Sequence, residues 1–475
     1  MPLGILASGG NNLLTQLYQI VMILSFLVLP ALIIFGPKLM VWQVDRRMKD
    51  ALMELEGYKD ATEAMFLDKL TSSPKPGLKD KMTSLKNFQM SQPTTLDPSG
   101  MVQKLEHVLD TSEDNFDRFV RNHADTEDEE EIADLTMAFK GVMGTNQIHK
   151  VMTHFRQLIK KTQNFQMIGL VNMMMPIYTE IAEAQKGATR AFVNQAPTGD
   201  GIGPLVAAKL IESDEEEIET AAEDIIKSEE EINGQKVHVV KSKGPGARLG
   251  KYGDAIDTLA EENDLDAIIT VDAAGKFEGE ETGTVHEGVG VMMGGPGVEK
   301  SKIEGAATDH DVPLEGVVIK QAPPEASKPM KKEIYEAYHE AVDKVNELVA
   351  EYDGEVAIIG VGNTCGVGNT RSDVAGVHNS LRKFWKEYEE QEEEEVSYMG
   401  MMGVMPGGDS AQLEKTKNSL LWNLPRYGLF PSLHLFPNFS FSLPLFFIQA
   451  IPIKAYEENS AGFCFGLDGK CCFRY

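Results

Sequence analysis

The spacing of apolar residues changes along the chain, and each change predicts a different kind of structure. Residues 13–36 contain no charged side chain, and about 24 residues at 1.5 Å each reach roughly 36 Å as a helix, enough to span a ~30 Å hydrocarbon layer. Between residues 101 and 187, apolar residues recur at helical spacing, and glycine and proline are sparse. From residue 188 to residue 400, short apolar runs alternate with helical stretches.

Several of the short apolar runs are typical of β-strands. They are TRAFVNQ, KVHVVKS, DAIITVDA, GTVHEGVGVMM, PLEGVVIKQA and EVAIIGVGN. Strands that alternate with helices predict an α/β domain, with a mostly parallel sheet flanked by helices. Such sheets bind ligands at the carboxyl ends of their strands, so we expect the chemistry there.

The chain therefore divides into six predicted segments. They are a short exterior N-terminus at residues 1–12, a transmembrane helix at 13–36, a juxtamembrane helix and linker at 37–100, a helical subdomain at 101–187, the α/β domain at 188–400 and a flexible or atypical C-terminal extension at 401–475. The linker is indicated by the proline, glycine and serine of TSSPKPGLKD and SQPTTLDPSG. In the extension, repeated prolines disfavour a second membrane helix, because each removes a backbone hydrogen bond.

Basic residues close to the apolar segment predict its orientation. Lys38, Arg46, Arg47 and Lys49 follow it, so the positive-inside rule places the C-terminal region in the cytoplasm. A cleaved signal peptide is the competing interpretation. No Lys or Arg precedes the run, however, and no small-residue cleavage site follows it. We expect a single-pass protein of the cell membrane that contacts the lipid bilayer through this helix.

The net charge limits the kinds of binding partner that we expect, and the cysteine content indicates the redox compartment. The chain has 45 Lys plus Arg against 73 Asp plus Glu, a net charge of -28, which argues against a nucleic-acid partner because polyanions repel each other. A protein partner remains open. The 4 cysteines show no disulfide-framework spacing, which fits a reducing compartment.

Two aspartates are the candidate catalytic groups. Asp200 lies in an Asp-Gly-Ile-Gly turn after a predicted strand, and Asp272 ends the apolar strand DAIITVDA. Neighbouring parallel strands would bring the two carboxylates together, where they could hold a metal or transfer a proton. His310, between two aspartates in ATDHDVPLEGVVI, is a third candidate.

These residues resemble a known family over roughly residues 188 to 350. An asparagine is followed six residues later by an acid and then by Gly-x-Gly; further along, a strand ends in Asp-Ala and precedes Gly-Thr-Val. This spacing looks like that of the endopeptidases that mature nickel-iron hydrogenases and, more loosely, that of the spore germination protease. The first likeness implies one divalent metal, nickel or zinc, held by Asp200, Asp272 and His310, with His286 as a rival ligand. The second implies two aspartates without a histidine, and leaves open whether a metal binds.

The chain as a whole has a second resemblance. Over about residues 13 to 400 it resembles an uncharacterised family of archaeal membrane-anchored proteins, with KSKGPGARLGKYGD and AIIGVGNTCGVGN as the apparent signature motifs. This likeness implies no known activity.

The first glycine loop is a candidate anion site. Gly244 and Gly246, with Arg248 and Lys251 nearby, lie in a loop between a predicted strand and helix and could cradle a phosphate; a plain turn is the alternative.

The second glycine loop follows the last predicted strand. Gly360, Gly362 and Asn363 are candidates for nucleotide binding, although the loop matches neither a Walker motif nor GxGxxG. Cys365, in the same loop, is either a nucleophile or a small buried residue.

Three interpretations of the α/β domain follow. The first is a peptidase-like hydrolase, in which Asp200 and Asp272, with or without a metal, activate water against a peptide or other amide bond. The second is a non-catalytic, phosphate- or nucleotide-binding regulatory module that uses the glycine loops. In the third, the aspartates only cap helices and turns.

Overall fold

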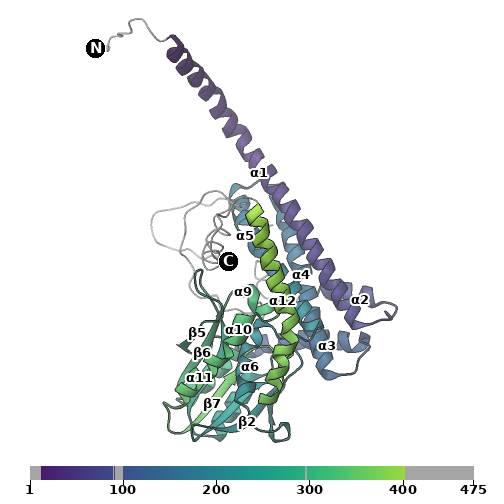
Figure 1. The fold of residues 1–475 in the computed structure, drawn as a ribbon. Helices are drawn as coiled ribbons and strands as arrows, with labels where there is room; N and C mark the ends of the chain where they lie inside the picture. The colour runs from purple at the N-terminus through teal and green to yellow at the C-terminus, as the bar shows by residue number, and fades with distance from the viewer. Residues whose placement is uncertain (1–11, 89, 91–99, 295–296, 402–475) are drawn as a thin grey trace, which may run out of the picture.

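The computed structural model describes residues 12–88, 90, 100–294 and 297–401, and shows a helical region followed by an α/β region (Figure 1). The expected α/β class with a preceding helical region is confirmed. The predicted N-terminal segment 1–12 and C-terminal extension 401–475 lie almost entirely outside the described residues.

The helical region contains five helices in the described part of the chain. They are α1 (Asn12–Leu70), α2 (Leu78–Lys86), α3 (Met101–His123), α4 (Glu129–Thr162) and α5 (Phe165–Val193). The C-terminal part of α1 lies along α4 and α5, while its N-terminal part projects away from the rest of the protein (Figure 1). Apolar side chains of α1, α4 and α5 form a common core, which is why these three helices stay together.

The predicted transmembrane helix, residues 13–36, lies in the projecting part of α1. Side chains from 25 to 35 fall outside the described set. Across the part of the chain that is described, no helix meets the length and apolarity needed to cross a membrane.

A cluster of phenylalanines forms the centre of a second helical core. Phe139 in α4 is fully buried, and its ring centroid lies 4.8 Å from that of Phe119, 5.3 Å from Phe66 and 5.9 Å from Phe116. Aromatic pairs at these separations contribute beyond the area they bury. Phe139 therefore links α1, α3 and α4.

The α/β region is built on a seven-stranded sheet in the order β1-β2-β3-β7-β4-β6-β5. The strands are β1 (Glu219–Ala222), β2 (Ile225–Ile232), β3 (Gln235–Ser242), β4 (Leu265–Gly275), β5 (Val285–Val289), β6 (Leu314–Gln321) and β7 (Glu355–Gly360). The four central strands are parallel, whereas β1, β2 and β5 pair antiparallel at the two sides. The sheet is thus mixed rather than mostly parallel. The sequence IIKSEEEI of β2 gave no strand signal, because glutamates fill much of it.

Helices cover both faces of the sheet. One apolar core joins the sheet to α6 (Ile202–Leu210), α10 (Lys332–Glu336), α11 (Tyr338–Val349) and α12 (Val374–Met401). A second core joins the opposite face to α7 (Tyr252–Glu262) and α8 (Val298–Asp309). Short elements complete the region: η2 (Gly199–Gly201), η3 (Glu215–Glu217), α9 (Pro323–Ser327) and η4 (Arg371–Asp373).

The predicted strand TRAFVNQ is wrong. These residues continue α5, which ends at Val193, so the helical region extends past the predicted boundary at 187. Ala188, Ala191 and Phe192 are buried at the three- and four-residue spacing of a helix, and alanine favours helix over strand. Asp200 therefore follows a helix and a short loop instead of a strand.

We expect Phe139→Ala to destabilise the helical region by about 3–5 kcal/mol, because the substitution removes a fully buried ring and leaves a cavity. Urea unfolding followed by circular dichroism measures this change. Phe277→Ala is the matched control, since Phe277 is 76% exposed, and it should change stability by no more than about 0.5 kcal/mol. Equal effects of the two substitutions would contradict the assigned core.

Candidate functional site

The candidate site lies at the carboxyl edge of the four parallel strands. In the register of the sheet, Val271 of β4 pairs with Gly360 of β7, and Asp272 pairs with Val318 of β6. The loops after β3 and β7 and the turn η2 meet β4 at this edge, since hydrogen bonds join them there. This is where parallel sheets present functional groups.

Asp272 is the more deeply buried of the two aspartates, with 3% of its surface exposed. Its Oδ1 accepts a hydrogen bond from the Ala273 amide at 2.6 Å, whereas its buried Oδ2 has no hydrogen-bond partner within the described residues. Burial, and then the charge of Asp200, raise the pKa of Asp272 well above its usual range. The neutral acid is therefore the favoured form.

Asp200 lies in η2, directly before α6, and its Oδ2 accepts a hydrogen bond from the Asn363 amide at 2.9 Å. Burial raises the pKa of Asp200 to about 6, and the bond from Asn363 opposes that shift. Because the charge of Asp200 also acts on Asp272, the two carboxyl groups form one electrostatically coupled pair.

Glycines allow the turn that carries Asp200 to approach the end of β7. Gly362 has φ of 140°, and a Cβ there would collide with the Asp200 carbonyl oxygen. A Cβ on Gly360 would lie 2.6 Å from the Gly203 carbonyl oxygen. The glycines predicted to bind a nucleotide thus serve close backbone packing within the protein.

Four buried polar atoms at this edge make no hydrogen bond within the described residues: Asp272 Oδ2, Asn363 Nδ2, Gln321 Oε1 and Thr198 Oγ1. Gln321 ends β6 and donates through Nε2 to the Gly199 carbonyl at 3.2 Å, which places it beside the Asp200 turn. An unpaired buried polar group costs about 1–3 kcal/mol, so each of these atoms would gain from a bound water or polar ligand. Thr198 and Gln321 were not predicted from the sequence, although a polar residue at the end of the apolar strand β6 was a signal for Gln321.

Tyr252 adds a hydroxyl that sequence analysis also missed. It is 1% exposed, donates to the Gly360 carbonyl at 2.8 Å and accepts from the Ser242 amide at 3.1 Å. Burial, together with the charges of Asp272 and Asp200, raises the pKa of Tyr252. The hydroxyl therefore stays protonated near the aspartate pair.

The structure does not bring His310 to the aspartates. His310 ends α8 and precedes β6, so it lies exposed at the amino edge of the sheet, opposite Asp272. His286 of β5 is in register with Val318 and hence with Asp272, but it is two strands away, roughly 10 Å at normal strand spacing, and exposed. Within the described ranges, no group of three or more His, Cys, Asp or Glu residues is placed to hold a metal ion.

The loop predicted as an anion cradle binds carboxylates from the helical region. The Gly246 amide donates to Glu130 Oε2 at 2.7 Å, and the Ala247 amide donates to Asp134 Oδ1 at 2.9 Å. Arg248 pairs with Glu130 and, at 3.2 Å, with Asp224. The loop thus supplies donors to carboxylates, as its sequence indicated, but those carboxylates belong to the protein.

Lys251 is used in the same way. Its Nζ lies 2.5 Å from Asp110 and 3.4 Å from Glu106, both in α3. The two cations of the predicted cradle therefore join the α/β region to α3 and α4. Gly244 contributes its amide to Asn369 Oδ1 at 2.8 Å.

Asp134 and Cys365 form a buried contact at this junction. Asp134 is 2% exposed, and burial raises its pKa to about 7 although Cys365 and the Ala247 amide donate hydrogen bonds to it. Burial and the neighbouring Asp134 charge raise the pKa of the Cys365 thiol well above its usual range. Cys365 is thus a buried thiol, which is unfavourable for a nucleophile.

A buried lysine was not singled out from the sequence. Lys241, near the end of β3, is fully buried and donates to the carbonyls of Ser242 and Gly368 at 2.9 and 3.0 Å, and to Asn369 Oδ1 at 3.3 Å. Burial lowers its pKa to about 7. The two acceptors after β7, Gly368 and Asn369, indicate that Lys241 holds the loop after β7 against β3.

Asp200→Asn should stabilise the protein at neutral pH. The pKa of Asp200 is about 6 in the folded protein and 3.8 in the reference state, so folding favours the protonated form. The stabilisation that the folded protein gains from the protonated Asp200 is complete below pH 3.8 and is lost as the pH rises through about 6. Asparagine can still accept from the Asn363 amide. We expect a gain of about 2–3 kcal/mol at pH 7.5 and none at pH 3.5.

Urea unfolding at both pH values measures this difference. The control is Asp257→Asn, because Asp257 is exposed on α7, outside the site. A destabilised Asp200→Asn variant at pH 7.5 would show instead that the ionised carboxylate supports the fold.

Comparisons with known proteins place the chain in a family. The model described as "Protein of unknown function (DUF1512) N-terminal domain" matches residues 22–195, and "Domain of unknown function (DUF1512) C-terminal" matches residues 198–368. No curated protein and no solved structure matches the chain. The interval between the two matches coincides with the loop between α5 and η2. The expectation of an uncharacterised family is confirmed: the chain belongs to the two-domain DUF1512 family.

Proposed function

We propose that the protein is a membrane-anchored hydrolase in which Asp200 and Asp272 activate water against a peptide or other amide bond. The observation that carries this proposal is the coupled pair of carboxyl groups at the carboxyl edge of the sheet, beside buried polar atoms without partners. Paired carboxyl groups with raised and separated pKa values are typical of acid–base sites.

The different environments assign the two roles. Asp200, with a pKa of about 6, is mostly ionised at pH 7 and takes the proton from water as the water oxygen bonds to the carbonyl carbon. Asp272 remains protonated and donates its proton to the carbonyl oxygen. In the second step, Asp200 gives its proton to the leaving nitrogen, the C–N bond breaks, and Asp272 regains a proton from the new carboxyl group.

The resemblance to the hydrogenase-maturation endopeptidases and the germination protease points to the same reaction class. A divalent metal, if bound here, would be held by Asp200 and Asp272, and would supply a more acidic bound water. The oxygens of Thr198 and Gln321, which lie beside Asp200 without a hydrogen-bond partner in the described residues, are hard metal ligands. Nickel and zinc favour the softer nitrogen of histidine, so these oxygens suit a harder ion better. His310 contributes nothing to this edge.

The alternative is a regulatory module that binds a phosphate or nucleotide through the glycine loops. The contacts favour the hydrolase, because a phosphate at Gly246 and Arg248 would have to displace Glu130 and Asp134. At the second loop, a ligand would have to separate Gly362 from Asp200. Both displacements would open the junction between the two regions.

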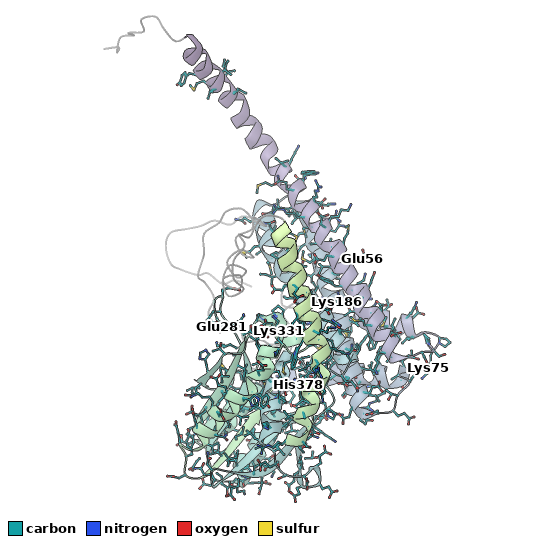
Figure 2. All side chains as sticks on the ribbon, in the orientation of Figure 1. Glu56, Lys75, Lys186, Glu281, Lys331 and His378 are labelled. Atoms are coloured by element: carbon teal, nitrogen blue, oxygen red, sulfur yellow. The ribbon has the colours of Figure 1, made fainter. Side chains whose placement is uncertain are left out.

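The proposed anchor rests on exposed apolar side chains in α1. Tyr18, Ile20, Val21, Ile23 and Leu24 are between 52% and 66% exposed. Figure 2 shows this part of α1 standing apart from the other side chains of the protein. Contiguous exposed apolar surface of this kind marks contact with a lipid bilayer or a partner. The uncharged stretch 13–36 and the basic residues after it favour the bilayer, with residues 45–401 in the cytoplasm.

Either Asp200→Asn or Asp272→Asn should lower amide hydrolysis by at least about 100-fold, because each removes one proton-transfer group. The measurement is cleavage of a fluorogenic peptide library by the full chain in a non-ionic detergent. Asp257→Asn should retain the wild-type rate. Calorimetric titration with zinc, nickel and manganese, on wild type and both variants, tests metal binding at the same pair.

Two results would contradict the proposed site. One is peptide cleavage that both asparagine variants retain. The other is an experimental structure in which the two carboxyl groups lie more than about 12 Å apart, too far to share a substrate or an ion.

Protease added to sealed, right-side-out membrane vesicles should leave a fragment covering residues 50–415 intact, because the bilayer shields it. Immunoblotting against the α/β region measures its survival. Detergent permeabilisation is the control and should make the fragment susceptible. Digestion in sealed vesicles would contradict the proposed orientation, and recovery of the protein away from the membrane fraction would contradict the anchor.

A further inference from the structure

A cavity of about 450 Å³ lies on the face of the sheet covered by α6, α10, α11 and α12, apart from the aspartate pair. Lys209 of α6, Tyr335 of α10, Tyr338 of α11 and Arg371 of η4 line it, together with residues of α12. Its volume lies within the range of about 300–1,000 Å³ that is usual for small-molecule sites.

The charge of the cavity opposes that of the whole protein. Acids outnumber bases 73 to 45 along the chain, yet the lining contains Lys209 and Arg371 and no carboxylate. In the described part of the chain, the Lys209 ammonium has no carboxylate or hydrogen-bond partner. Arg371 pairs with Glu212, and both of these side chains are at least half exposed. Glu212 offsets the charge of Arg371, so the local positive charge is that of Lys209, and such a charge concentrates small anions.

Two buried tyrosines provide donors and a flat wall. Tyr335 and Tyr338 are 8% and 6% exposed, and their ring centroids lie 5.3 Å apart. Each tyrosine hydroxyl can donate one hydrogen bond to a ligand. Burial, and then the neighbouring Tyr338, raise the pKa of Tyr335 to about 12, so Tyr335 remains a donor at neutral pH.

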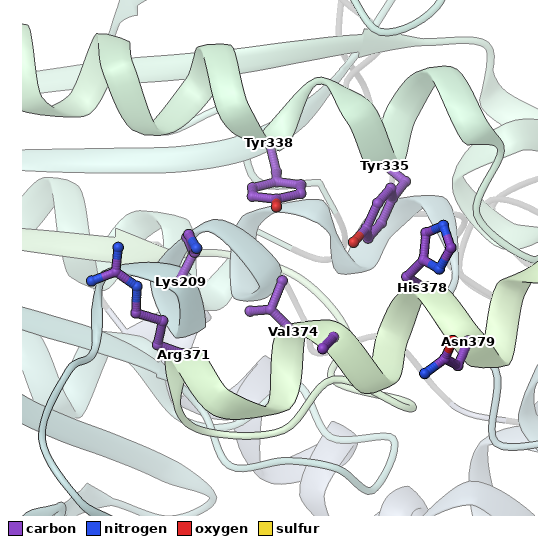
Figure 3. A pocket seen from close by; sticks show the side chains of 8 residues that line it. Lys209, Tyr335, Tyr338, Arg371, Val374, His378 and Asn379 are labelled. Carbon is purple, nitrogen blue, oxygen red and sulfur yellow. The ribbon is translucent and has the colours of Figure 1, made fainter.

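The side chains are arranged along the length of the cavity (Figure 3). Lys209 and Arg371 lie at one end, and His378 and Asn379 lie at the other, with Val374 between them below the two tyrosines. The His378 ring is 5.8 Å from the Tyr335 ring. The cavity therefore has a cationic end and an aromatic, partly apolar middle.

We propose that this cavity binds a small organic anion, with its phosphate or carboxylate group at Lys209, beside the Arg371–Glu212 ion pair, and a planar ring beside Tyr335, Tyr338 and Val374. The site is separate from the proposed hydrolytic centre, although α6 links them. Lys209 lies near the C-terminus of that helix, and Asp200 directly precedes its N-terminus.

The test is calorimetric titration of the full chain, in a non-ionic detergent, with phenyl phosphate and benzoate as probes. Inorganic phosphate and neutral benzamide separate the contributions of the charge and of the ring. We expect saturable binding of at least one anionic probe, at least ten-fold weaker binding of inorganic phosphate and of benzamide, and a loss of affinity at high salt, because the contact is electrostatic.

Lys209→Met should weaken binding of the anionic probe at least ten-fold while leaving the melting temperature unchanged, since the amine makes no bond in the described structure. Lys386→Met is the matched control on α12, because Lys386 has a 78% exposed side chain outside the cavity, and it should bind as wild type does. Tyr338→Phe should weaken binding less than Lys209→Met and serves as a second variant that preserves the fold.

Three outcomes would overturn the proposal. They are no binding of either anionic probe to wild type at about 10 mM, equal binding by the Lys209→Met and Lys386→Met variants, and an affinity for benzamide equal to that for the anionic probe that binds. Loss of peptide hydrolysis in the aspartate variants, with probe binding retained, would show that the two sites are independent.

Discussion

The structure depends on one interaction between its two regions: carboxylates of α4 accept hydrogen bonds from backbone amides of the loop after β3. Glu130 and Asp134 bind the amides of Gly246 and Ala247, as a bound anion would. The same loop receives the Thr364 hydroxyl, which donates to the Gly246 carbonyl at 2.7 Å. Docking of the helical region therefore fixes the loop after β3 and, through Thr364, the loop after β7.

The position of Asp200 follows from that fixed loop. Asn363 precedes Thr364, and its amide is the donor to the Asp200 carboxylate. Asn363 Oδ1 in turn accepts from the Cys365 amide at 2.9 Å, which holds the asparagine side chain in place. A candidate catalytic carboxyl group is thus positioned by a hydrogen-bonded series that begins in another domain. This series gives a physical reason for the two family domains to occur together in this chain.

Some of the excess acidic residues form ion pairs between the helical and α/β regions. Salt bridges from Lys251 and Lys302 to Glu106 of α3, and from Lys328 to Glu183 of α5, join the α/β region to the helices. Each exposed pair contributes little alone, but several pairs around the buried Asp134 contact fix the orientation of the two regions. The cavity at Lys209 differs from this junction in its charge, because no acidic residue lines the cavity.

The sequence by itself determined the elements whose periodicity is strong. Apolar spacing directly predicts the helices between residues 101 and 187 and the central strands β3, β4, β6 and β7. The apolar side chains of these elements are buried, whichever element packs against them. It also placed Asp272 in a central strand, although the predicted strand end is wrong, because β4 continues to Gly275. Polar β2 and the helical end of α5 were missed, because antiparallel pairing and continuation of a helix are decided by neighbours, not by local propensity.

Only the tertiary structure decided which residues share a site. Asp200 and Asp272 are 72 positions apart, and their coupling depends on how η2 folds over β4 and β7. His310, which is closer to Asp272 in sequence, lies at the opposite edge because α8 returns the chain to the start of β6. The glycine loop had the chemistry of an anion site in its sequence, but its anion comes from α4. Local sequence specifies the donors, and long-range packing selects the partner that accepts from them.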